Sequence, residues 1–534
     1  MRRQWKWNVG WTWQWPLNWK SQRDRNRGWL RLVGGCVLAA MLLMPLAGCF
    51  SGSDNPENPV SPGSTVNLIY YTIGDPDPDL RMVNDKLNEI LAKKIGVTVT
   101  YIKVGWQEYE GRLNTLVSAG TPFDIAFAPE YTTYAQRGAW LKLNDYLSSV
   151  GKDMYDAIDP LFWQGVRMDD GGIYGVPTNK ELAVRDQWMY PDALVKKYGI
   201  DISKYDTLAS LEPLLKMIKQ KEPSYQPMEL DKGSQNFFAL DGYEYLSDQP
   251  FPLMVKATDP DSRVVNIFET AEARKVLDIL RRYYVAGYIN EDAAMRESQG
   301  LERGAPVFWK AAGGGPLSEN SWSKDRGYKL VAYPVTPALI TTTSIRGGVM
   351  AVSADTKHPV EAVKFLNLLN TDPEVRNLIN FGIEGVHYTL DRNGQVVPIS
   401  PMDSKGKPIP DAPRSYAGVQ YTQGNWFILK TMGGQFPDPL DKWDQFRAAN
   451  KEAVNSSTLG FTPDLSRLPI QMQNVQMVWD KYFPSLMTGS VDVDTELPKF
   501  NRELRQAGVD ELRAEVQRQL DAWRAARSQS GSAG

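Results

Sequence analysis

The chain has 534 residues, of which 42% are hydrophobic and 23% are charged, a composition typical of a folded globular protein. The formal net charge is −3, but residues 1–48 carry eight of the 60 Lys and Arg and only one of the 63 Asp and Glu, so the remainder has a net charge of about −10. An acidic body excludes a nucleic-acid-binding protein, because neutralising phosphates requires a basic face. A hydrophobic core stops growing beyond about 250–300 residues, so two lobes or domains are expected.

The N-terminal segment has the order of an export signal. Residues 2–31 are basic, and residues 32–47 form an apolar run about as long as the hydrophobic part of a signal peptide and short for a membrane-spanning helix. The run ends in a Leu-Ala-Gly-Cys tetrapeptide that matches the bacterial lipobox, whose cysteine takes a diacylglycerol. The sequence therefore predicts a signal peptide at 1–48 and a protein lipid-anchored through Cys49 to the extracytoplasmic face of the cell membrane. A plain membrane anchor with an incidental cysteine is the alternative.

Strands and helices alternate at the start of the body. Residues 66–72, 97–104 and 123–127 read as strands. Asp77-Pro78 opens a helix between the first two, because a carboxylate caps and proline fits the first turn, and a second helix covers 108–119. This β-α-β-α-β order predicts a parallel sheet with helical cover.

Ligands of open parallel sheets bind beyond the carboxyl ends of the strands. Tyr71 and Glu130 lie at or just past such ends, so we predict that both line the edge of a binding cleft.

The rest of the chain continues the mixture of strands and helices. Residues 166–177 read as a hairpin that turns at Asp170-Gly171-Gly172, and residues 350–352 read as a strand. Helices are predicted at 191–198, 208–221, 271–286, 360–369 and 510–526.

Short segments spread over residues 65–526 resemble one family in their order and spacing. Together they are similar to the large extracellular solute-binding proteins of carbohydrate ABC importers, in particular the lipoprotein branch of Gram-positive bacteria. The matching segments are GTPFDI at 120–125, GIYGVP at 172–177, KYG at 197–199, KEP at 221–223, HPVEA at 358–362, DPE at 372–374, FGIEGVHY at 381–388 and QRQLDAW at 517–523.

The resemblance implies a two-lobed, periplasmic-binding-protein-like α/β fold of type II, with parallel-rich sheets, helical cover and a hinge. It implies a monomer that captures a carbohydrate, an oligosaccharide in particular, in the cleft and delivers it to ABC transporter permease subunits without catalysis. The expected parts are the signal peptide (1–48), the lipidated cysteine and a Ser/Gly/Pro-rich tether (49–64), lobe 1 (65–183), lobe 2 (184–338), a return segment of lobe 1 (339–410), lobe 2 with hinge-region helices (411–526) and a disordered tail (527–534).

Aromatic rings and one arginine are the remaining ligand-binding candidates. Sugar rings present apolar C–H faces that pack on flat aromatic rings. Trp188, Trp309, Trp322 and Trp426 lie in polar or Gly-bearing segments typical of cleft walls, although ordinary packing is the alternative for each. Trp309 precedes Lys310–Gly315, which reads as a flexible loop. Arg346 is a candidate to bind the carboxylate of a uronic acid through two N–H groups of its guanidinium. The alternative is that Arg346 is an ordinary surface arginine.

No cofactor is predicted. Some large relatives hold a structural calcium, but Asp75, Asp77 and Asp79 are followed by residues that do not complete an EF-hand loop, and helix capping explains them better. The chain has only two Cys and two His, which are too few to favour a disulfide framework, a zinc site or Ser/His/Asp catalysis. No pair of carboxylates stands out for catalysis. A surface glycoside hydrolase or lyase, and a sugar sensor without transport, are the alternative functions.

Overall fold

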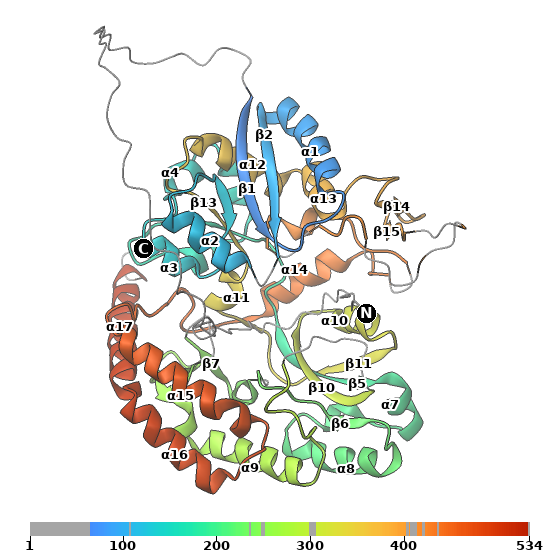
Figure 1. Ribbon diagram of the computed structural model, residues 1–534, viewed down its shortest axis with the longest axis vertical. Helices are drawn as coiled ribbons and strands as arrows, with labels where there is room; N and C mark the ends of the chain where they lie inside the picture. The colour runs from blue at the N-terminus through green and yellow to red at the C-terminus, as the bar shows by residue number, and fades with distance from the viewer. Residues whose placement is uncertain are drawn as a thin grey trace, which may run out of the picture. The chain divides into compact units, whose positions relative to one another are not determined.

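The structure, a computed structural model, describes residues 65–531 apart from gaps at 106–107, 234–235, 247–250, 298–305, 402–404, 406–408, 410–413, 419–421 and 435–436. The predicted signal peptide, the lipidated Cys49 and the tether to residue 64 lie outside the described residues. Figure 1 follows the helices and strands along the chain from blue to red. None of the helices in the described ranges is long and apolar enough to cross a membrane.

The first sheet has five strands in the order β2-β1-β3-β13-β4. As predicted, β1 pairs in parallel with both β2 and β3, while β13 runs antiparallel to β3 and β4. The strands are β1 (Val66–Ile73), β2 (Val97–Val104), β3 (Ile125–Phe127), β4 (Val176–Pro177) and β13 (Val349–Val352).

Helix α1 (Leu80–Ile95) connects β1 to β2 and packs its apolar stripe on the first core. Val83, Leu87 and Leu91 recur every four residues and are fully buried. The helix was expected to open at Asp77, which was wrong. The carboxylate of Asp77 binds Lys103 and the backbone N–H of Ala417 instead of capping the helix.

The hairpin predicted at 166–177 is confirmed by the bridge between Arg167 and Ile173 and by a left-handed Gly171.

The other helices on the first core have 4 to 13 residues. The helices are α2 (Tyr109–Ser118), α3 (Tyr131–Gln136), α4 (Asn144–Leu147), α5 (Lys152–Ala157), α6 (Pro160–Val166), α11 (Thr342–Arg346), α12 (Pro359–Thr371) and α13 (Pro373–Phe381), followed by the hairpin of β14 (Tyr388–Leu390) and β15 (Val396–Pro398).

A second set of sheets lies later in the chain. The four-stranded sheet has the order β11-β5-β10-β6, and a three-stranded antiparallel sheet has the order β7-β8-β9. The strands are β5 (Arg185–Pro191), β6 (Gln226–Met228), β7 (Tyr243–Tyr245), β8 (Leu253–Lys256), β9 (Val265–Asn266), β10 (Val307–Gly314) and β11 (Leu330–Pro334).

Short and long helices accompany the second set of sheets, and Figure 1 shows the last three of them side by side in red. The predicted helices at 191–198, 271–286 and 360–369 are confirmed as α7, α9 and α12 to within one or two residues. The helices here are α7 (Asp192–Tyr198), α8 (Glu212–Lys221), α9 (Ala271–Val285), α10 (Ser318–Arg326), α14 (Lys442–Glu452), α15 (Pro469–Met487), α16 (Val493–Gln506) and α17 (Val509–Gly531), with 3₁₀ turns η1 (Ile202–Lys204), η2 (Ala209–Leu211), η3 (Phe237–Asp241), η4 (Ile267–Glu269) and η5 (Trp426–Ile428).

Two local expectations were wrong. The flexible loop expected at Lys310–Gly315 is mostly strand β10, because Lys310–Gly314 pair with β5 and the backbone hydrogen bonds of the sheet fix them. Helix α17 continues to Gly531, past its predicted end at 526, so residues 527–531 of the expected disordered tail are helical.

Buried apolar side chains form two large cores. The first core draws on residues 68–182 and 340–379, together with Tyr416 and Leu459. The second core draws on residues 188–311 and 461–520. Within the described residues, the chain therefore passes from one core to the other near residues 183–187, 312–339 and 460.

Candidate functional site

The passages between the two cores are extended segments that pair with one another. Strand β12 (Leu339–Ile340) runs parallel to β16 (Val454–Asn455), and Val184 bridges to Leu339. The side chain of Asn450 accepts from the backbone N–H groups of Leu182 and Ala183 at 2.8 and 3.0 Å. We call these segments, residues 180–187, 334–342 and 454–462, the crossing segments.

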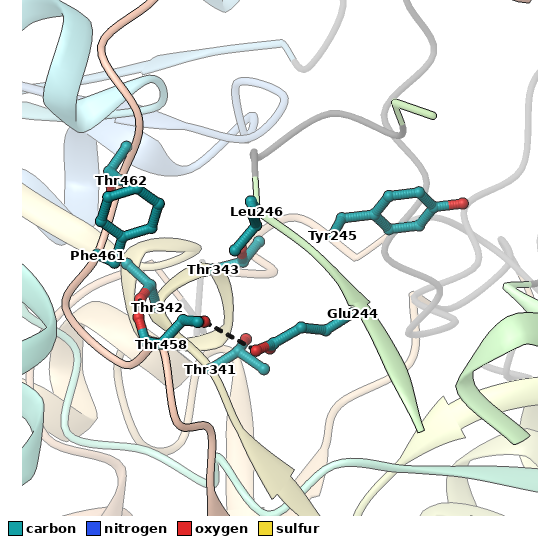
Figure 2. Close-up of a pocket in the computed structure, with 9 residues that line it drawn as sticks. All are labelled: Glu244, Tyr245, Leu246, Thr341, Thr342, Thr343, Thr458, Phe461 and Thr462. Atoms are coloured by element: carbon teal, nitrogen blue, oxygen red, sulfur yellow. Dashed lines mark hydrogen bonds between the residues drawn. The ribbon is translucent and has the colours of Figure 1, made fainter. Parts of the chain in front are cut away.

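A small polar pocket lies where the crossing segments meet strand β7. Its volume of about 10 Å³ has room for about one water molecule. Figure 2 shows Glu244 pointing from β7 toward Thr341 and Thr458, whereas the ring of Tyr245 points away from them. The pocket is lined by Glu244, Tyr245, Leu246, Thr341, Thr342, Thr343, Thr458, Phe461 and Thr462.

Glu244 ties the second core to a crossing segment. Its carboxylate accepts hydrogen bonds from the hydroxyls of Ser456 and Thr458, the latter at 2.8 Å. Glu244 is only 7% exposed, and burial raises the pKa of its carboxyl, although the two hydroxyl donors act in the opposite direction.

The threonines of the pocket hold the backbone around it. The hydroxyl of Thr341 accepts from the N–H of Ser344, and the Ser344 hydroxyl donates back to the backbone carbonyl of Thr341, which together fix the start of α11. Thr342 Oγ1 accepts from the N–H of Gly460 at 2.8 Å. The lining thus combines threonine hydroxyls and one carboxylate, which exchange hydrogen bonds with other hydroxyls, with the apolar side chains of Leu246 and Phe461.

Arg346 is linked to this pocket by its hydrogen bond to the lining residue Thr462 and is 5% exposed. Its guanidinium donates to the carbonyl of Gly165 at 2.8 Å, to the hydroxyl of Thr132 at 2.7 Å and to that of Thr462. The guanidinium also lies 5.5 Å from the ring centre of Tyr131. The arginine that was expected to hold a ligand carboxylate is therefore engaged by protein groups here, and its ligand contact stays a prediction.

Tyr71 lies in the first sheet and Glu130 lies just past the end of β3, as expected, but the two residues differ in exposure. Tyr71 pairs with Ile102 and Ala126 and is 7% exposed in the first core. Glu130 is exposed and has a φ of 49°, in the left-handed region that non-glycine residues rarely adopt. Because Glu130 directly precedes α3, the segment that carries it reaches Arg346 through Thr132. Ligand contact by Tyr71 or Glu130 stays a prediction.

The tryptophans expected in cleft walls are buried. Trp188, Trp309, Trp322 and Trp426 are 1, 0, 0 and 3% exposed. Trp188 and Trp309 meet edge to face at 5.5 Å in the second core, and Trp426 packs against Trp443 at 6.4 Å. Ordinary packing therefore accounts for these rings in this conformation, and sugar contact by them stays a prediction.

Glu181 is a candidate that the sequence analysis missed. Its Oε1 is buried and has no hydrogen-bond partner within the described part of the chain. The carboxyl fills the space beside Gly315, where an added Cβ would lie 0.9 Å from that oxygen. Burial raises the pKa of Glu181 to about 8, against the opposing effect of Lys442, Lys180 and Arg185. The sequence signal that could have identified Glu181 is its position: it is an acidic residue in a short segment between a hairpin and an apolar strand.

Two neighbours of Glu181 are also perturbed by burial. Burial lowers the pKa of Lys180 to about 8 and raises that of Asp186 to about 6. The crossing segment 180–187 therefore carries ionisable groups in a water-poor setting, where hydrogen bonds to a ligand are stronger than in water.

The aspartates weighed for calcium have protein partners. Asp77 binds Lys103 at 2.6 Å, and Asp79 lies 3.3 Å from the ring of His387. The expectation that these side chains cap α1 was wrong, since Asp79 precedes the helix without a side-chain capping bond. Among the described residues, no group of three or more His, Cys, Asp or Glu is placed to hold a metal ion.

Two α/β cores that are joined by paired crossing segments, with a polar pocket at the junction, define the class of two-lobed binding proteins. A family model described as bacterial extracellular solute-binding protein matches residues 86–383, more than half of the chain. A second model, described as a domain of unknown function (DUF3502), matches residues 457–525. The chain belongs to the family of bacterial extracellular solute-binding proteins, and its place of action is extracytoplasmic.

Individual relatives agree with this family. A carbohydrate ABC transporter substrate-binding protein of Streptococcus pneumoniae (serotype 4, strain ATCC BAA-334 / TIGR4) is 26% identical over 501 residues, which cover 93% of this chain and 98% of the relative. The crystal structure of the N-glycan transport solute binding protein NgtS from Streptococcus pneumoniae is 26% identical, with a TM-score of 0.77 over 86% of this chain and 100% of NgtS.

Further structures extend the comparison. NgtS in complex with Man1GlcNAc and with Man5GlcNAc gives TM-scores of 0.70 and 0.66, in both cases at 26% identity over 86% of this chain and 99% of NgtS. The alginate-binding protein AlgQ2 without calcium, at 16% identity and a TM-score of 0.56, shares the fold. The predicted type II, periplasmic-binding-protein-like α/β fold is confirmed.

Proposed function

We propose that the protein captures a carbohydrate, an oligosaccharide in particular, between its two cores and delivers it to the permease subunits of an ABC transporter. The observation that carries this proposal is the set of crossing segments between two separate cores, where hydroxyls and the Glu244 carboxylate line a pocket and segment 180–187 holds the buried Glu181 oxygen. The similarity to a carbohydrate-transporter binding protein and to NgtS supports a sugar as the solute.

Capture proceeds by closure of the two lobes. The pocket at the junction has room for about one water molecule, so a sugar needs a rearrangement of the crossing segments. The TM-scores of the three NgtS structures fall from 0.77 to 0.66 at the same identity, which supports a protein family that changes conformation with its ligand. A ligand that binds the closed form more tightly shifts the equilibrium toward it.

We propose the lobe limits expected from the sequence, with lobe 1 formed by 65–183 and 339–410, and lobe 2 by 184–338 together with 411–526, which also holds hinge-region helices. Tyr416 and Leu459 nevertheless pack in the first core. The chain works as a monomer, tethered to the membrane by lipid on Cys49, which raises its local concentration near the permease. Binding proceeds without turnover, and the sugar leaves unchanged.

A thermal-shift screen of the full chain in detergent tests this function. Mannose- and GlcNAc-containing oligosaccharides, fructo-oligosaccharides and alginate oligosaccharides are compared, with peptides as the control class. A ligand that binds only the folded state raises the Tm by mass action. We expect a rise with one sugar class and recovery of the intact sugar by chromatography. A shortened sugar would instead identify a hydrolase or lyase, and no rise with any sugar would reject carbohydrate capture.

A further inference from the structure

We propose that a cavity between α5 and α6 is a second carbohydrate site, which takes a single neutral pyranose ring. The site shares no lining residue with the pocket at the junction of the crossing segments and goes beyond the function proposed above. Its volume of about 320 Å³ is at the lower end of the range of roughly 300–1,000 Å³ found for small-molecule sites. The lining includes Tyr155, Asp156, Ile158, Trp163, Gln164 and Arg167.

An aromatic platform forms one side of this cavity. The rings of Tyr155 and Trp163 stack with centres 5.0 Å apart and planes 29° apart. Trp163 is 2% exposed and its indole N–H donates to the carbonyl of Tyr155 at 3.0 Å, while Tyr155 itself is 37% exposed. A buried ring thus holds an exposed ring in a fixed orientation. Such a flat apolar face is what the C–H face of a pyranose packs against.

The polar groups around the platform carry both signs of charge. Asp156 has a carboxylate that is 57% exposed and paired with Lys152, and exposed Arg167 donates through Nη1 to the carbonyl of Gly171 at 2.8 Å. The carboxylate accepts hydrogen bonds, and the guanidinium has further N–H groups to donate. Because hydroxyls both donate and accept, this pairing suits a neutral polyhydroxyl ligand rather than an anion or a cation.

The cavity is independent of the pocket at the junction. No residue lines both, and the contact of α6 with α11 involves different atoms, with an added Cβ at Gly165 meeting Ile345 at 2.4 Å. The α5–α6 cavity is also about thirty times larger in the same conformation. A single sugar ring can therefore enter it without closure of the lobes.

Saturation-transfer NMR on the full chain in detergent tests this site. The probes are methyl α-D-mannopyranoside and methyl β-D-glucopyranoside, with the acyclic polyol mannitol as the ringless control. We expect saturable binding of at least one pyranoside and none of mannitol. Tyr155→Ala is expected to weaken that binding about two- to tenfold, the range for loss of one aromatic contact, whereas Tyr155→Phe keeps the platform and binds as the wild type does.

The same variants are titrated with the oligosaccharide that shifts the Tm, so that the two proposals fail separately. Retained oligosaccharide binding in Tyr155→Ala, with loss of the pyranoside, supports two sites. Equal loss of both would make the cavity the main site and overturn a second one. The proposal is also overturned if the wild type binds no pyranoside, if Tyr155→Ala binds it unchanged, or if mannitol binds equally well. These last three results leave capture at the junction untouched, whereas equal loss of both ligands would move the main site to the cavity.

Discussion

At the scale of single residues, two glutamates whose pKa values are raised by burial lie in a crossing segment or against one. Glu181 has a buried oxygen without a partner in the described ranges, and Glu244 relies on two hydroxyls from a neighbouring segment. A buried carboxyl without full hydrogen bonding destabilises the folded state. Such groups persist where function uses them, and a bound sugar would supply the missing donors.

Replacement of Glu181 by Gln tests the burial of this carboxyl. The folded-state pKa of about 8 lies above the usual value of 4.5, so the folded chain binds more protons than the unfolded chain between these pH values. Stability contributed by the protonated carboxyl is therefore present at low pH and is lost as the pH rises toward 8. Gln does not ionise, so Glu181→Gln should match the wild type at pH 4 and exceed it at pH 8 by about 1–4 kcal/mol, since one pKa unit corresponds to about 1.4 kcal/mol.

Denaturant unfolding at both pH values gives this difference. The exposed Glu384, changed to Gln, serves as the control for loss of a surface carboxyl and should change the free energy of unfolding by less than about 0.5 kcal/mol. Equal pH dependence in the wild type and Glu181→Gln would contradict a strongly perturbed carboxyl.

Replacement of Gly315 is predicted to destabilise the fold while Glu181 is present. An added Cβ would overlap Oε1 at 0.9 Å and Cδ at 2.1 Å, so the whole carboxyl has to move. Gly315→Ala should cost about 1–3 kcal/mol, as for other overpacked sites. In a Glu181→Ala background the same change should cost little. A double-mutant cycle measures this coupling, and additive losses would mean that the two residues are not in contact.

At the scale of elements, the local sequence decides where most strands and helices form. The site at the crossing segments instead depends on pairing between segments that are far apart in the chain. The strands at 66–72 and 97–104 and helix α9 were predictable because apolar periodicity decides them locally. Strand β10 was read as a loop because its glycines favour one, but its backbone is fixed by β5. Glu181 was overlooked for the same reason, since its burial depends on Gly315, far along the chain.

Thr458 is predicted to hold its crossing segment to β7. Thr458→Val keeps the shape and removes the hydroxyl that donates to Glu244 at 2.8 Å. Leaving a buried acceptor short of a donor costs about 1–3 kcal/mol. Loss of the donor also raises the pKa of Glu244 further, so the destabilisation should be greater at pH 8 than at pH 5.

Thr343→Val is the matched control for Thr458→Val in the same unfolding experiment. Thr343 lines the same pocket, but within the described residues its hydroxyl makes no hydrogen bond that the structure records. It should therefore lose little stability. Equal losses in the two variants would show that the bond to Glu244 contributes nothing specific.

At the scale of the whole molecule, two cores with few connections between them are suited to rigid-body closure. The family and its two-lobed fold were predictable from short segments dispersed over the chain, because their order is preserved. The residues that line the cleft could not be predicted from the sequence, because the exposure of a side chain depends on how distant segments pack around it. The four tryptophans that looked like cleft walls are at most 3% exposed.

Small-angle scattering should detect closure. Saturation with the sugar that raises the Tm is expected to reduce the radius of gyration of the full chain in detergent, after subtraction of the detergent contribution by contrast matching. The pyranosides that occupy the α5–α6 cavity should leave it unchanged. An unaltered radius with the captured sugar would contradict a closing mechanism.

The most direct test of capture at the crossing segments is calorimetric titration of the wild type and Glu181→Ala with that sugar. The account predicts saturable one-to-one binding by the wild type and recovery of the sugar intact. Below pH 8 the Glu181 carboxyl is mostly neutral, and loss of an ordinary hydrogen bond costs about 0.5–1.5 kcal/mol, so Glu181→Ala should bind about two- to tenfold more weakly while remaining folded. Equal affinity in the two proteins, or no binding by the wild type, would contradict the claim that the crossing segments form the sugar site.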